Sequence, residues 1–264
     1  MTTATSFVFG DLSLKSFGLS LCSFDGGGEA SISLPYVPSY TTEKPPAHYR
    51  WQVAGSKYET PITFSVSIGK TCGPNHLISR DEERALAKWL TACPDFQEFH
   101  FEDYDTDWDD SFGISYFVHV TSLEKEMLGG NCIGFTVEFT ADSPFGFSSP
   151  ITAKLSAGVT TIYVDSDSND AIYPHLVLTA NAPGNFSIQN LTNGSFSRFH
   201  NLSAGEKLTM EKTGSGLLSS LPSHVILDDF DKNWISLTDG ANELLVEGDA
   251  SLTLTYREPR KAGV

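Results

Sequence analysis

The sequence predicts an all-β fold with a single helix, and three observations support this prediction. Apolar and polar residues alternate with a period of two in many short segments, Gly, Asn, Asp or Pro bounds each of them, and one segment alone has helical periodicity. This combination is typical of antiparallel sandwiches and barrels. The 264 residues, 40% of them hydrophobic, are enough for one large or two ordinary globular domains.

Two segments before residue 142 show the strand pattern clearly. Residues 62–68 alternate Ile, Phe, Val and Ile with small polar residues, so their apolar side chains share one face. In residues 133–141, the side chains of Ile133, Phe135, Val137, Phe139 and Ala141 are expected to point inward. Later segments repeat the alternation at Phe186/Ile188, Leu208/Met210, Leu244/Val246 and Leu252/Leu254/Tyr256.

Residues 80–92 are predicted to form the helix. Ser79 and Glu82 have the spacing of a capping box, in which the first residue caps the helix and the fourth returns a hydrogen bond. Leu86, Trp89 and Leu90 then form an apolar stripe, and Pro94 ends the run. We expect Trp89 to be buried against a sheet. The alternative is that Trp89 faces outward and contacts a neighbouring subunit.

A domain boundary is predicted within residues 142–150, where two prolines and a glycine interrupt any regular element. The helix and three of the four tryptophans precede it, and only strand-like segments rich in Thr, Ser and Asn follow. The sequence therefore predicts domains at 1–146 and 147–264.

The composition limits the possible functions. A formal net charge of −16 repels both nucleic acid and anionic membranes. No secretion signal and no apolar run of about 20 residues is present, so we expect a soluble chain made in the cytosol. The cysteines are scattered and are expected to be reduced thiols: Cys22, Cys72, Cys93 and Cys132.

No group of residues has the spacing of a catalytic or metal site. The acidic runs 103–110 and 165–170 begin like calcium-binding loops, but Trp108 and Asp170 stand where the EF-hand template requires glycine. Both runs are expected to be solvated loops. Cys72 and His76 are better explained as a turn leading into the helix than as a nucleophile–base pair. We therefore predict no catalytic, cofactor-binding or metal-binding residue, and no enzymatic activity.

Several segments in one order resemble the distal tail (Dit) proteins of bacteriophages. The most specific is the junction in which a long strand runs into Asp142, Ser143, Pro144 and Phe145. The others are Ser16-Phe17-Gly18-Leu19, Ala87-Lys88-Trp89-Leu90, Gly240-Ala241-Asn242-Glu243-Leu244 and the closing segment 252–260. The resemblance spans almost the whole chain.

The resemblance implies a β-sandwich or split-barrel ring domain followed by a galectin-like antiparallel β-sandwich. In some relatives a C-terminal segment returns to the ring domain, so the last strands have two expected locations. The implied assembly is a homohexameric ring in the virion tail tip, assembled in the cytoplasm of the bacterial host. Its implied partners are the tail tube protein, the tail-tip hub protein, and receptor-binding or baseplate proteins. Phage DNA would only pass through the lumen, and no membrane binding is implied.

The candidate assembly residues are therefore Leu86, Trp89, Leu90, Asp142, Ser143, Pro144 and Phe145. The alternative function is a carbohydrate-binding β-sandwich module for attachment to the host surface. Sugar-binding galectins use a His-x-Asn-x-Arg strand and a Trp-x-x-Glu turn. Here Asn201 follows His200 directly, and Leu237 stands three residues after Trp234. A sandwich used as a scaffold is therefore the preferred interpretation.

Overall fold

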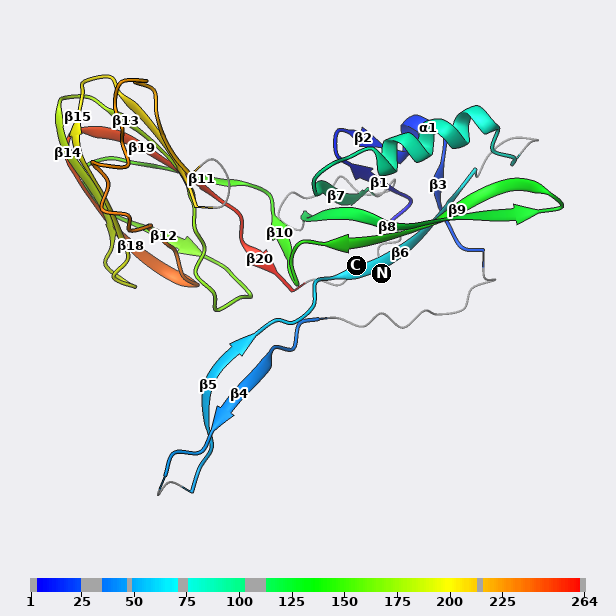
Figure 1. Ribbon diagram of the computed structural model, residues 1–264, viewed down its shortest axis with the longest axis horizontal. Helices are drawn as coiled ribbons and strands as arrows, with labels where there is room; N and C mark the ends of the chain where they lie inside the picture. Colours follow the sequence, from blue (N-terminus) through cyan, green and yellow to red (C-terminus); the bar gives the residue numbers. More distant parts are fainter. Residues whose placement is uncertain are drawn as a thin grey trace. The chain divides into compact units, whose positions relative to one another are not determined.

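The computed structural model describes residues 4–24, 35–46, 49–70, 76–102, 113–212 and 216–261. The chain forms two compact units, Met1–Phe147 with Lys261–Val264, and Ser148–Arg260. We call them unit 1 and unit 2. The described residues contain one α-helix among many antiparallel strands, which confirms the predicted fold class (Figure 1).

Unit 1 is built on one open antiparallel sheet. Its strand order is β2-β1-β7-β8-β9-β6-β3, with β10 paired to β8, while β4 and β5 form a separate two-stranded sheet. The elements of unit 1 are β1 (Ser6–Phe9), β2 (Leu12–Ser13), the 3₁₀ turn η1 (Leu14–Phe17), β3 (Ser20–Cys22), β4 (Ser39–Glu43), β5 (Gln52–Lys57), β6 (Thr63–Gly69), α1 (Arg80–Thr91), β7 (Gln97–Glu102), β8 (Ile114–Leu128), β9 (Asn131–Ala141) and β10 (Gly146–Ser148).

The neighbouring strands β6 and β9 contribute their apolar faces to the core of unit 1. Phe64 lies opposite Phe139 and Val66 opposite Val137, so the alternation of each strand supplies the same face. The inward residues of β9 are buried as predicted except Ile133, which is half-buried. The ring of Phe139 lies within 6 Å of four other phenylalanine rings. Such offset and edge contacts add to the burial energy of the aromatic core.

Helix α1 begins as the sequence predicts. The Ser79 hydroxyl accepts a hydrogen bond from the Glu82 amide at 3.3 Å, and the Glu82 carboxylate accepts one from the Ser79 amide at 2.8 Å. The Lys70 ammonium also binds Glu82, at 2.7 Å. The hydrogen bond from Lys70, followed by those from Ser79, lowers the pKa of Glu82 to about 2. The predicted capping box is therefore confirmed.

Ser79→Ala is expected to lower the free energy of unfolding of unit 1 by about 1 kcal/mol, because the helix loses one satisfied terminal amide. Ser79→Thr keeps the hydroxyl and is the matched control. Urea denaturation followed by circular dichroism measures both variants. Equal stability of Ser79→Ala and the parent protein would show that the cap contributes nothing to folding.

Unit 2 is a sandwich of two antiparallel sheets. One has the order β11-β19-β13-β16-β17 and the other β12-β18-β14-β15. Its strands are β11 (Ile151–Leu155), β12 (Gly158–Val164), β13 (His175–Ala180), β14 (Gly184–Asn190), β15 (Phe196–Leu202), β16 (Lys207–Glu211), β17 (Gly216–Ser219), β18 (Gly240–Glu247) and β19 (Ala250–Tyr256). The last strand, β20 (Pro259–Arg260), belongs to neither sheet of the sandwich and pairs with β10. One core cluster joins both sheets, with Leu176 and Leu254 from the first and Ile188 and Leu244 from the second.

Candidate assembly surface

The structure shows where some of the chemically suggestive segments lie. The acidic run 103–110 and Cys72 lie outside the described residues. In the run 165–170, Asp165 forms an ion pair with Arg260 at 2.7 Å, and the Ser168 hydroxyl accepts a hydrogen bond from the Asp170 amide. The thiols of Cys22, Cys93 and Cys132 are free, as expected. Within the part of the chain that is described, no group of three His, Cys, Asp or Glu side chains has metal-binding geometry, and no helix is long and apolar enough to cross a membrane.

The predicted helix residues lie against the sheet of unit 1. Leu86 and Leu90 are buried, and Trp89 is half-buried. The Trp89 ring stacks on Phe17 at 4.7 Å and on Phe7 at 5.8 Å between centroids. Its indole N–H donates a hydrogen bond to the Phe9 carbonyl at 3.1 Å. These contacts are within one chain, so a role of the helix in assembly stays a prediction.

The junction residues form a tight turn after β9. The Ser143 hydroxyl accepts a hydrogen bond from the Phe145 amide at 3.1 Å, and the Phe145 ring is buried edge-on against Tyr58 at 4.8 Å. The Asp142 amide donates to the Phe117 carbonyl at 2.9 Å. Asp142 as a whole is exposed, but desolvation of its carboxyl by the neighbouring protein raises its pKa. The junction thus ties β9 to β8 and holds a partly desolvated acid, while Pro144 is half-buried.

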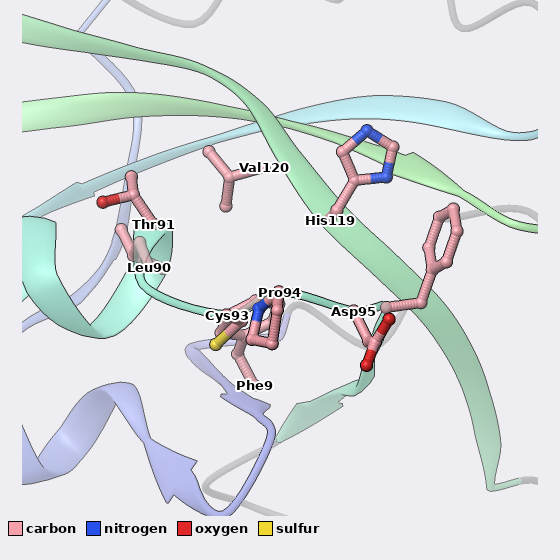
Figure 2. Close-up of a pocket in the computed structure, with 9 residues that line it drawn as sticks. Phe9, Leu90, Thr91, Cys93, Pro94, Asp95, His119 and Val120 are labelled. Carbon is pink, nitrogen blue, oxygen red and sulfur yellow. The ribbon is translucent and has the colours of Figure 1, made fainter.

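A groove lies beside this junction. One pocket of about 320 Å³ lies between the connection that follows α1 and strand β8, with Thr91, Cys93, Pro94 and Asp95 on one side and His119 and Val120 on the other (Figure 2). A second pocket, of about 480 Å³, lies between residues 58–61 and 140–144. The two pockets share Phe96 and His119, whose rings meet edge-on at 4.8 Å. We call the two pockets together the groove.

A second exposed feature, which was not predicted from the sequence, is the hairpin of β4 and β5. These strands pair only with one another (Figure 1). Every residue in them is exposed. We call the described residues 39–46 and 49–57 the arm. Its large apolar side chains are open to solvent, with Tyr40 59%, Trp51 68% and Val53 63% exposed. Exposed apolar groups at this density are typical of interaction surfaces.

The polar side chains that bear on sugar binding take part in contacts inside unit 2. The His200 imidazole lies 3.1 Å from the Asp231 carboxylate, and the Asn201 amide donates to Asp229 at 2.7 Å. The Trp234 ring packs edge-on against Phe230. These side chains therefore hold parts of unit 2 together.

Both units match models of phage tail proteins. Residues 2–143 match the family described as phage tail protein N-terminal domain, and residues 145–256 match the phage tail C-terminal domain. This chain belongs to the phage tail proteins. The predicted resemblance is confirmed, and the protein is a structural component of the tail. No curated protein sequence matches it significantly.

The fold is similar to those of two solved phage proteins. The first is the crystal structure of Dit (gp 19.1) of phage SPP1, described as a paradigm of the hub adsorption apparatus in phages that infect Gram-positive bacteria. The match has 10% identity, covers 97% of this chain and 99% of that chain, and has a TM-score of 0.65. The second is a chain of the phage P2 baseplate in its activated conformation with Ca, at 7% identity, 98% and 99% coverage and a TM-score of 0.51.

Proposed function

We propose that this tail protein forms a hexameric ring that joins the tail tube to the baseplate or tip proteins. The observation that carries the proposal is the fold likeness to a Dit hub protein over 97% of the chain, which includes both units. The family match supports the same role, because both domain models describe phage tail proteins. The ring would continue the tail channel and leave a passage for DNA during ejection.

The proposed function is mechanical and does not involve catalysis. Identical subunits close a ring when one surface of each copy binds a different surface of the next and the rotation returns to its start. The exposed arm supplies one surface that such a contact can bury. The net charge of −16 fits a lumen through which DNA slides, because acidic walls repel the phosphate backbone.

The proposed partners follow from a position at the end of the tail tube. One face of the ring would bind the tail tube protein, and the other the tail-tip hub protein. Receptor-binding or baseplate proteins would attach around it, and assembly would take place in the cytoplasm of the bacterial host. The carbohydrate-binding alternative has no observation in its favour among the described residues.

Mass photometry of the purified protein at increasing concentration tests the oligomeric state. We expect a species of six copies of the 28.8 kDa chain, or a stacked pair of such rings. The same measurement on tail tips released from virions detects the ring even if it closes only on its template in the tail. A stable species of three or five copies in either sample would contradict the proposal.

A further inference from the structure

We propose that the arm of one copy lies in the groove of the next copy, and that this contact closes the ring. The inference rests on the proposed function and names the two surfaces that meet. The arm is exposed on its own chain, so it does not fill its own groove. Each copy carries one arm and one groove, so the contact repeats around a ring without a free end.

The arm has one apolar and one polar face. Paired residues of an antiparallel ladder point to the same side. Tyr40 pairs with Ser56, and Thr42 with Val53. Ala54 is the extra residue of a bulge between Thr41 and Thr42, which keeps Tyr40 and Val53 on one side.

The residue two positions before Val53 is Trp51, whose side chain is 68% exposed. Alternation along the extended chain places it on the same side as Val53. The opposite face carries the polar residues Ser39, Thr41, Glu43, Gln52 and Lys57. A lone two-stranded hairpin is at best marginally stable in water, so an amphipathic one is stabilised when another surface covers its apolar side.

The residues of the groove are suited to cover the apolar face of the arm. The residues that line it include Phe96, His119, Pro94 and Pro144. Phe96 is 43% exposed, and His119 is the one ring it contacts among the described residues, so part of its ring remains accessible to a further aromatic ring. Stacked and edge-on aromatic pairs stabilise a contact beyond the area that they bury.

The charges of the two surfaces are complementary. The arm carries Lys44 and Arg50 between its strands, which is a basic segment in a chain of net charge −16. The groove is lined by Asp95 and Asp142, neither of which has a cationic partner among the described residues. The third acid of the groove, Glu59, already binds Lys57 at 3.0 Å. Contacts between the cations of the arm and the carboxylates of the groove would favour the arm of another copy, rather than an uncharged surface, as the occupant of the groove.

Photo-cross-linking on assembled rings or tails tests the contact directly. Benzoylphenylalanine replaces Val53 on the apolar face of the arm, and a matched variant replaces its neighbour Gln52 on the polar face. Mixed ¹⁵N-labelled and unlabelled copies identify cross-links between chains. We expect the variant at Val53 to link to residues 91–96 or 140–144 of another copy, at least tenfold more often than the variant at Gln52.

The outcomes separate the two proposals. If rings form but the variant at Val53 links to other segments, or only within its own chain, this inference is wrong and the proposed ring still stands. A protein that is monomeric even in tails overturns both.

A charge swap provides an independent measurement. Arg50→Glu is expected to raise the concentration for half-assembly at least tenfold, and Arg50→Glu with Asp142→Arg to restore it. Thermal melting shows whether Asp142→Arg folds, and Trp51→Ala weakens the same contact without touching the groove. If Trp51→Ala and Arg50→Glu both assemble like the parent protein, the arm is not the interface.

Discussion

Trp89→Ala is expected to lower the free energy of unfolding of unit 1 by about 3–5 kcal/mol, as for other large aromatic residues truncated in a packed site. The substitution removes the stacking on Phe7 and Phe17 and leaves the Phe9 carbonyl without its indole donor. The cost combines lost burial, a residual cavity and an unpaired acceptor. Because a domain of this size is stable by only about 5–15 kcal/mol, unit 1 loses much of its margin.

Differential scanning calorimetry measures the effect of Trp89→Ala. The two units have separate cores, so we expect one transition to move to lower temperature and the other to stay. Trp51→Ala is the matched control, because it removes an exposed tryptophan of the same unit. Trp51→Ala should leave melting unchanged and weaken assembly. If Trp89→Ala melted normally and lost assembly instead, Trp89 would be an interface residue.

The second large effect concerns a buried carboxylate in unit 2. Glu206 is 1% exposed and accepts hydrogen bonds from the Ser203 amide, the Ser219 hydroxyl and the His224 imidazole, at 2.9, 2.5 and 2.6 Å. The other nitrogen of His224 lies 2.9 Å from Asp229. Glu206→Ala is expected to lower the stability of unit 2 by about 3–5 kcal/mol, because the Ser203 amide, the Ser219 hydroxyl and one nitrogen of His224 lose their acceptor in a buried site.

The same cluster predicts how the stability of unit 2 changes with pH. Hydrogen bonds to Asp229 and Glu206 raise the pKa of His224 above that of a free histidine. Burial opposes ionisation of Glu206, but its hydrogen bonds outweigh burial and lower its pKa, and the bond to His224 lowers that of Asp229. The histidine contribution is full below about pH 6.5 and is lost as pH rises through the raised pKa. The carboxylate contributions are present above about pH 4.3 and are lost as pH falls through the lowered values.

Unit 2 is therefore expected to be most stable between about pH 4.5 and 6.5 and to weaken above this window. Urea denaturation of the parent protein and His224→Gln, at about pH 5.5 and 8.5, measures the difference. In His224→Gln, the stability of unit 2 should decrease much less between about pH 5.5 and 8.5 than it does in the parent protein. Equal slopes in the two proteins would show that His224 does not titrate in this cluster.

Local patterns predicted the parts of the fold that depend on neighbouring residues. The Ser79–Glu82 box fixed the start of α1, and alternation placed Phe64 and Phe139 inside. Sequence reasoning failed where exposure depends on distant contacts. Tyr40 and Val53 alternate like core residues but lie on a strand pair that no other strand covers. Glutamate is usually a surface residue, yet Glu206 is buried.

The groove was equally inaccessible to sequence reasoning. Its residues come from five parts of the chain, Phe9, 58–61, 90–96, 119–120 and 140–144, which are brought together by the pairing of β1, β7, β8, β9 and β6 in one sheet. Of the groove residues, the sequence named only Leu90, Asp142 and Pro144 as assembly candidates. The domain boundary was predicted after residue 146. The first unit runs to Phe147, and the two family matches end at residue 143 and begin at residue 145.

Averaged electron micrographs of intact tails, with a label fused to this protein, test the central claim most directly. We expect labelled density at the distal end of the tail tube with sixfold rotational symmetry about the channel. Threefold or fivefold symmetry of that density, or label along the tube instead of at its end, would contradict a hexameric hub at the tail tip.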